Sequence, residues 1–223
     1  MEAKDEMGMT VLMLVSQWGH LDVVKYLIDN GADMEAKHRY GQTALMKATE
    51  WGHLDVVKYL VENGADLEAI DRDRQTVLMW AAKNGSLEVC QYLTEQGVDV
   101  KAKDNCGETA LFCAATLGHL EVCQYLIEQG ADVKAKNKYG RTALMYAIGH
   151  GHLEVCKYLI EQGADLDAKD KDGETVQDYA KKWRRVDDCV EFLEEYQKKD
   201  TVLSKANDSP KGGFWQRVLG GRD

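Results

Sequence analysis

The sequence predicts an all-α solenoid of stacked helix-turn-helix units, joined by short hairpin-like turns. A period of 33 residues predicts it first, in the glycines Gly8, Gly41, Gly107, Gly140 and Gly173. A second glycine series, Gly31 to Gly163, keeps the same spacing, and Asp follows each member two residues later. Each period also holds two short apolar segments with helical spacing, and such a pair can bury its apolar faces only by stacking on its neighbours.

The unit at residues 137–169 justifies each element in turn. Thr142 suits a helix N-cap, because its hydroxyl can accept from a free backbone N–H of the first turn. The apolar residues within 143–148 then line one face of a short helix, and those within 153–160 form the stripe of a second helix. Gly163 stands where a helix end favours positive φ. The polar residues that follow predict a tight turn into the next unit.

The recurring pattern G-x-T-A-L-M-x-A, then G-H-L-E-V-x-x-Y-L-I, then G-A-D resembles the ankyrin repeat family. The resemblance covers residues 5–198. The chain departs from the family's usual Thr-Pro-Leu-His start, since no Pro follows the threonines and Met, Phe or Asp replaces His. The resemblance implies a protein-recognition module.

We expect one ankyrin repeat domain over residues 1–198 and a flexible tail over 199–223. The expected repeats span about residues 5–37, 38–70, 71–103, 104–136, 137–169 and 170–198. In the last repeat, Lys181, Lys182, Arg184 and Arg185 replace apolar and glycine positions, as a polar terminal cap requires.

Two units depart from the pattern. Arg74 stands where the neighbouring turns have glycine, and a positive φ costs a non-glycine residue about 1 kcal/mol, so we expect a distorted turn there. The first helix of the first unit, residues 10–17, carries large apolar side chains. That end is either poorly capped or covered by another domain or a partner.

Charge and composition restrict the class of partner and the compartment. The net charge is −10, which argues against nucleic acid and against anionic membrane surfaces, because both bind through cationic side chains. The sequence has no apolar segment long enough to cross a membrane, and its acidic start does not resemble a signal peptide. The six cysteines are then expected to be reduced, in the cytoplasm, with the nucleus or a host-cell cytosol as alternatives. We expect a monomer or a weak dimer.

We expect no catalysis, metal or cofactor. Cys90, Cys123, Cys156 and Cys189 recur at the period, too far apart for a shared ligand, and are expected to be buried as small apolar side chains. Cys106 and Cys113 are expected to be exposed and oxidisable, and an enzyme using one of them as nucleophile is the least favoured alternative. Histidines at the start of second helices are expected to cap or to pack between repeats. Periodic Asp and Glu residues, at turn starts and on helices, are expected to form a solvated face.

The resemblance implies that the turn tips and the exposed side of each first helix form a concave, partner-binding groove. Mapped by register, the expected contact residues are Met7, Met9, Leu14, Trp18, Tyr40, Lys47, Trp51, Arg72, Trp80, Leu117, Tyr139, Arg141 and Tyr146. Tyr179 and Trp183 fall in matching registers of the last repeat.

The aromatic residues on this face point to its centre. Trp18, Trp51 and Trp80 are three of the five tryptophans, and Trp, Tyr and Arg dominate interface hot spots. We therefore expect binding to centre on the first three repeats. The alternative is that these rings pack on neighbouring first helices and only stiffen the array. The tyrosines that recur in the second helices, from Tyr26 to Tyr158, are expected to be structural.

The tail after residue 199 leaves the period and carries Phe214, Trp215, Val218 and Leu219. It is interpreted either as a disordered end, as a short linear motif, or as a segment that folds back on the solenoid. Two further alternatives remain open at this point. One is an adaptor or pathogen effector whose tail recruits a second factor, and the other is a designed or reconstructed repeat protein.

Overall fold

The computed structural model describes residues 4–182 and 188–196 of the 223-residue chain. The first helices of the successive units are α1 (Val11–Gln17), α3 (Ala44–Glu50), α5 (Val77–Asn84), α7 (Ala110–Leu117), α9 (Ala143–Gly149) and α11 (Val176–Lys182). The second helices are α2 (Leu21–Asp29), α4 (Leu54–Glu62), α6 (Leu87–Glu95), α8 (Leu120–Glu128) and α10 (Leu153–Glu161). Residues 188–196 are also helical.

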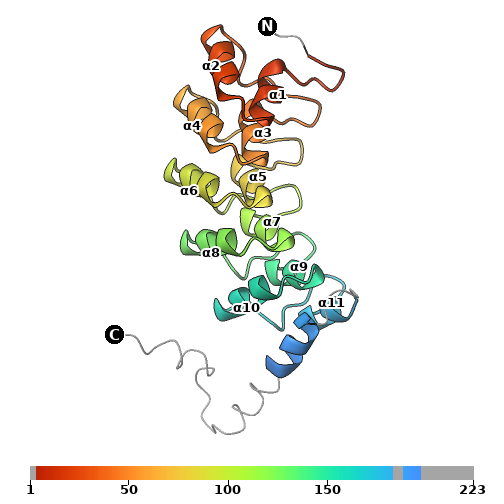
Figure 1. Ribbon diagram of the computed structural model, residues 1–223. Helices are drawn as coiled ribbons and strands as arrows, with labels where there is room; N and C mark the ends of the chain where they lie inside the picture. Colours follow the sequence, from red (N-terminus) through yellow and green to blue (C-terminus); the bar gives the residue numbers. More distant parts are fainter. Residues whose placement is uncertain (1–3, 183–187, 197–223) are drawn as a thin grey trace, which may run out of the picture.

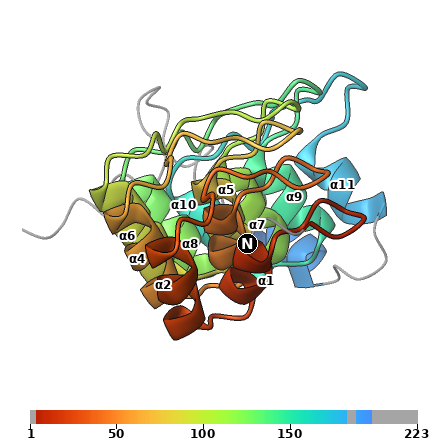
Figure 2. The same ribbon diagram turned by 90° about the horizontal axis from the view of Figure 1, so that it is seen from above.

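The helices form two parallel columns, so the predicted all-α solenoid is confirmed. The first helices stack in one column and the second helices in the other, with α1 at one end and α11 toward the other (Figure 1). Seen along the stack, the turns between units form a layer to one side of both columns (Figure 2).

Threonine side chains begin the first helices, as the sequence predicts. The hydroxyls of Thr10, Thr43, Thr76 and Thr142 accept from the backbone N–H three residues later, at 3.2–3.4 Å. Thr109 has the same extended backbone but makes no such bond. These caps satisfy N–H groups that have no partner within the helix.

Residues with a positive φ angle follow the second helices and also lie in the turns between units. Gly163 follows α10 with φ +87°, as predicted for a helix end. The prediction of a distorted turn at Arg74 is wrong. Its φ is +61°, and its N–H donates to the Asp71 carbonyl at 3.1 Å, as the N–H of Gly41 does to His38 at 2.8 Å. The same turn forms because the hydrogen bonds around it outweigh the strain in one residue.

A polar residue at the start of each unit organises the turn. The Oδ1 atom of Asp71 accepts from the N–H groups of Asp73 and Gln75 at 2.9 and 2.8 Å. Asp104, Asn137 and Asp170 repeat this pair of bonds, and in the second unit the His38 Nδ1 atom accepts from one N–H instead. All five side chains are buried. The expectation that periodic acids are solvated is therefore wrong for Asp71, Asp104 and Asp170, because the turn itself needs an acceptor there. It holds for the acids that open the connecting segments, Asp33, Asp66, Asp99, Asp132 and Asp165, which are exposed.

The core fills the space between the two columns. It includes the recurring leucines of the first helices, Leu45, Leu78, Leu111 and Leu144, each at most 1% exposed. Cys90, Cys123, Cys156 and Cys189 are buried and unpaired, as predicted. Such side chains act as small apolar fillers.

Histidines join consecutive units across the stack. The Nε2 atoms of His53, His119 and His152 lie 2.9–3.0 Å from the carbonyl oxygens of Gln17, Lys83 and Thr116, near the ends of the preceding first helices. Packing between repeats is thus confirmed for these rings. The junction between the second and third units differs, because the sequence has Ser86 at this position, and Ser86 and Asn84 lie against Gly52 there.

Candidate functional site

The turn tips are held in register by backbone hydrogen bonds. Arg39 N–H donates to the Met7 carbonyl at 2.8 Å, and Arg72 N–H donates to the Tyr40 carbonyl at 3.0 Å. Asn105, Lys138 and Lys171 repeat the pattern with Asp73, Cys106 and Tyr139 as acceptors. This ladder fixes the spacing of the side chains at the tips, so little backbone ordering remains to be done when a partner binds.

Two tyrosines extend from this ladder. Tyr40 and Tyr139 are 55% and 51% exposed. The Tyr40 ring packs edge-on against His38, with centroids 5.5 Å apart, and the Arg141 guanidinium lies 5.6 Å from the centre of the Tyr139 ring. Each ring is therefore held from one side and open on the other.

Trp18 and Trp51 occupy one position in consecutive units, at the C-terminal caps of α1 and α3. They are 58% and 56% exposed, more than any other described tryptophan. Exposed indole rings are unusual on a protein surface without a partner, because each leaves a large apolar area in water. These two rings are the strongest candidates for binding anchors.

Trp80 differs from the other two. It lies in the middle of α5, half-buried against the core, with the Lys83 ammonium 4.3 Å from the ring centre. Lys83 in turn donates to Gln75 Oε1 at 2.8 Å. Trp80 therefore has a different place in its repeat from Trp18 and Trp51, and it packs partly against the core.

In the second unit, Lys47 lies between the turn and α3. Its ammonium pairs with Glu50 Oε2 at 2.8 Å, and Gln42 Nε2 donates to the same oxygen at 3.4 Å. Only 11% of the Lys47 side chain is exposed. Little of this predicted contact residue therefore reaches the surface.

Tyr146 also forms hydrogen bonds within the molecule. Its hydroxyl donates to Glu108 Oε1 at 2.6 Å, and Asn137 Nδ2 donates to the same oxygen at 2.9 Å. Burial and the hydrogen bond to Glu108 raise the pKa of Tyr146 to about 12. The sequence reasoning missed Glu108 and Asn137. The polar residue at the start of every unit was the signal that could have pointed to Asn137.

Arg141 links the last two full turns. Its guanidinium lies 5.6 and 5.9 Å from the ring centres of Tyr139 and Tyr179, and its Nε atom lies 3.7 Å from Asp170 Oδ2. The Tyr179 hydroxyl donates to the same Asp170 oxygen at 2.9 Å, and this tyrosine is buried. Tyr179 is therefore a structural residue.

The other predicted contact residues are at least partly accessible. Arg72 and Leu117 are exposed, and Met7, Met9 and Leu14 are half-buried. Trp183 and the tail residues Phe214, Trp215, Val218 and Leu219 lie outside the described residues, as do Arg184 and Arg185 of the predicted cap.

The two cysteines that were expected to be exposed differ in their burial. The prediction that Cys113 is exposed is wrong, because this residue of α7 is only 7% exposed, and burial raises the pKa of its thiol to about 12. Cys106 is half-buried at a turn. Among the described residues, no group of three or more His, Cys, Asp or Glu side chains could hold a metal ion.

Comparison with known families decides what this architecture is. Residues 1–71, 69–137 and 134–203 each match a family model described as "Ankyrin repeats (3 copies)". The chain belongs to the ankyrin repeat family. No curated protein matches its sequence.

Ankyrin repeats are in general protein–protein interaction modules, and typically have no catalytic activity. The general role of the family in protein binding is therefore consistent with the exposed aromatic side chains and with the buried thiols. In the described part of this ankyrin repeat protein, no helix is long and apolar enough to span a bilayer. The expected repeat boundaries remain a prediction.

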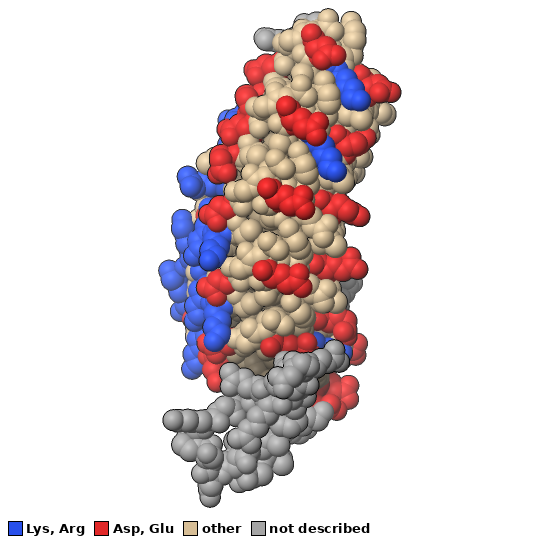
Figure 3. Space-filling view, turned by 90° about the vertical axis from the view of Figure 1, so that its left-hand side faces the viewer, with Lys and Arg blue, Asp and Glu red and all other residues tan. Residues whose placement is uncertain are grey.

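The column of second helices presents a different surface. Each of the helices α2, α4, α6, α8 and α10 has an acidic residue in its first turn: Asp22, Asp55, Glu88, Glu121 and Glu154. Acidic side chains cross this face in rows, and basic side chains form a column along one border (Figure 3). Of the recurring tyrosines here, Tyr26 is exposed and the four from Tyr59 to Tyr158 are half-buried.

Proposed function

We propose that this ankyrin repeat protein binds a protein partner through the first-helix face, defined as Trp18, Trp51, Tyr40, Tyr139 and the side chains between them. The binding has no chemical step. The observation that carries the proposal is the exposure of four large aromatic side chains, each above one half, on the first helices and the turn tips. Such side chains dominate the energy of protein interfaces when a partner covers them.

The tryptophan pair is the proposed centre, and the turn tips extend the contact toward the fifth unit. Trp18 and Trp51 are one repeat apart, so that two pockets or one apolar ridge on a partner could receive both. The hydrogen-bonded ladder of turns supports a pre-organised, concave groove, in which burial of the rings is offset by little loss of backbone entropy. We place this activity in the cytoplasm, where the free cysteines stay reduced.

The test compares two variants that remove exposed aromatic rings from different faces. One carries Trp18→Ala and Trp51→Ala, and the matched control carries Tyr26→Ala, since Tyr26 is 64% exposed on the second helices. Partners captured from lysate by the parent chain are identified and remeasured by calorimetry with purified proteins. The double variant should bind at least about 100-fold more weakly, and the control should bind like the parent.

The proposal is wrong if a verified partner binds the folded double variant as tightly as the parent. Circular dichroism and a melting curve establish that both variants remain folded. Weaker binding by the Tyr26→Ala control alone would place the contact on the second helices instead.

A further inference from the structure

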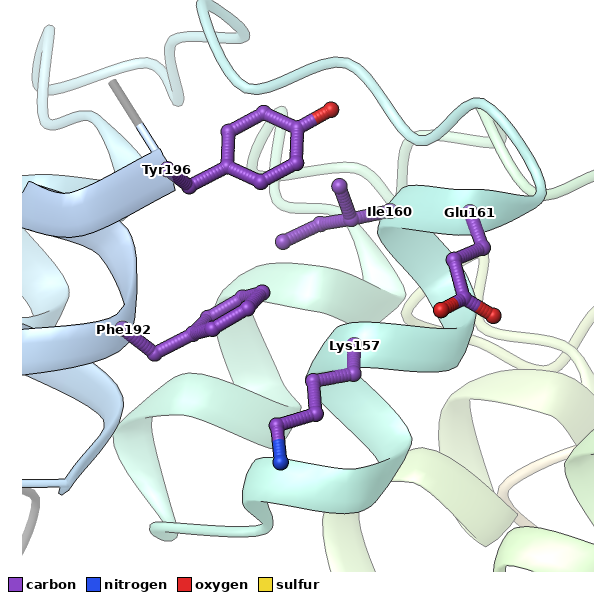
Figure 4. A pocket seen from close by; sticks show the side chains of 5 residues that line it. All are labelled: Lys157, Ile160, Glu161, Phe192 and Tyr196. Atoms are coloured by element: carbon purple, nitrogen blue, oxygen red, sulfur yellow. The ribbon is translucent and has the colours of Figure 1, made fainter. Parts of the chain in front are cut away.

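A pocket of about 100 Å³ opens between α10 and the terminal helix, residues 188–196. Its lining is mostly apolar and comes from Lys157, Ile160, Glu161, Phe192 and Tyr196. In Figure 4 the two aromatic rings extend from the terminal helix toward α10, with Ile160 opposite and Lys157 and Glu161 at the border. The pocket lies on the second-helix side of the molecule and is thus separate from the first-helix face.

The pocket exists because the last unit departs from the others at two positions. Where the earlier second helices have a leucine no more than 7% exposed, the last unit has Phe192, which is only half-buried. Where they end in a glycine, it has Tyr196, and the helix continues to this residue. These two larger side chains line the pocket on the side of the terminal helix.

The earlier units also have an apolar residue in the connecting segment that covers this region. Met34, Leu67, Val100, Val133 and Leu166 each pack against the core from that segment. The corresponding position after Tyr196 is Lys199. An apolar group is therefore needed from elsewhere to fill the space at the last unit.

The chain itself supplies such a group. Phe214, Trp215, Val218 and Leu219 are spaced to lie on one side of a helical turn. They are joined to Tyr196, which lines the pocket, through residues 197–213. A chain of this length without regular structure spans about 20–25 Å, which is short enough for the segment to reach the pocket. Its effective concentration there is on the order of millimolar, which makes even a weak contact populated.

The charge of the tail also complements the charge beside the pocket. Residues 199–223 hold five Lys or Arg and three Asp or Glu, a net charge of +2, with Arg217 inside the apolar segment. The terminal helix, which forms one side of the pocket, carries the exposed acids Asp188, Glu191, Glu194 and Glu195. Glu161 at the border of the pocket forms no ion pair with another described residue. Lys157, the basic residue of the lining, pairs with Glu154 at 2.7 Å.

From the pocket, the tether and the charges together, we infer that residues 214–219 of the same chain dock into this pocket and cover the last unit. The Val218 or Leu219 side chain enters the cavity, whose volume suits an aliphatic group. Trp215 covers Phe192, and Arg217 pairs with Glu161. The docked segment supplies the apolar side chains that the sequence lacks at the position of Lys199.

Hydrogen exchange of the full chain, read by mass spectrometry, tests this inference. Amides of residues 214–219 should exchange at least about tenfold more slowly than in an unstructured chain, as in a locally ordered segment. Glu161→Lys on the exposed border and Leu219→Ala in the segment should each abolish most of that protection. The matched control is Leu203→Ala, which removes a leucine from the tail outside the apolar segment and should leave the protection unchanged.

Three outcomes overturn the inference. One is exchange of residues 214–219 at the unprotected rate in the parent chain. Another is protection that survives both Glu161→Lys and Leu219→Ala in folded protein. The third is protection that increases with protein concentration together with a dimer in sedimentation, since the segment then docks on a second copy. Glu161 is exposed and Leu219 lies outside the described residues, and circular dichroism establishes that both variants remain folded.

Discussion

The imidazole of His152 reaches back across the stack, and its Nε2 atom lies 3.0 Å from the carbonyl oxygen of Thr116. The ring is placed directly against Gly118, which has φ +78° at the end of α7. A β-carbon added at Gly118 would overlap the ring. The glycine and the histidine therefore form one joint between two repeats, although each is part of a different helix pair.

Gly118→Ala should destabilise the protein by about 2–4 kcal/mol, because a left-handed backbone strain adds to overpacking against His152. Gly130→Ala is the matched control. Gly130 has φ +89° but no neighbour within 4 Å of an added β-carbon, so only the backbone strain of about 1–2 kcal/mol applies. Urea unfolding of both variants measures the difference, and equal losses would contradict the packing role of the histidine.

Arg74→Gly should stabilise the protein by up to about 1 kcal/mol. The turn already has the geometry of its glycine-containing neighbours, with φ +61° at Arg74, so glycine removes strain without changing the structure. Chemical denaturation measures the gain. A loss of stability would show that the Arg74 side chain makes a contact worth more than the strain.

Stability should fall as the pH drops below about 6.5, the ordinary pKa of histidine. Burial and then the nearby Lys47 ammonium lower the pKa of His38, and burial lowers the pKa of His152. The unfolded chain then binds more protons than the folded one between the lowered pKa values and 6.5, so acidification favours unfolding.

His38→Asn should weaken this pH dependence, since Asn137 fills the same position in another repeat and accepts two turn N–H groups. Unfolding free energies at pH 7.5 and 5.5 should differ less in this variant than in the parent. His20→Asn, at an exposed histidine, is the control and should keep the parental difference. An unchanged pH dependence in His38→Asn would remove His38 from the explanation.

Trp80→Ala should cost about 2–4 kcal/mol of unfolding free energy, whereas Trp51→Ala should cost less than about 1 kcal/mol. Trp80 packs against the core and Trp51 is 56% exposed. Thermal and urea unfolding of the two variants, followed by circular dichroism, measures the contrast. The reverse order would mean that Trp51 is the structural ring and would weaken the proposed binding surface.

The features that follow from local chemistry were predictable from the sequence. Threonine caps and the glycine after α10 need only the residue type and its place in the period. Arg74 and Cys113 were predicted incorrectly, because their environment depends on neighbouring units. The turn at Arg74 is held by the next unit, since the Asn105 N–H donates to the Asp73 carbonyl, and Cys113 is buried in α7, which packs against α5 and α9.

The candidate site was predictable in part for the same reason. Register alone places Trp51 and Tyr139 on the surface, and the structure finds both exposed. Register does not reveal that Tyr146 donates to Glu108, because these residues come from different repeats and their distance depends on how the repeats stack. Pairings between repeats are the part that sequence periodicity does not encode.

The junction at Ser86 has a mechanical consequence. Histidine hydrogen bonds join the first unit to the second, the third to the fourth and the fourth to the fifth. At the junction between α3 and α5, Ser86 takes the place of the histidine. Under mechanical load or thermal motion, the described part of the array should bend first at this junction between the second and third units. Trp18 and Trp51 then move together as part of the first two units, and Tyr139 moves with the units from the third onward. A change in the angle between these two parts adapts the molecule to partners of different curvature.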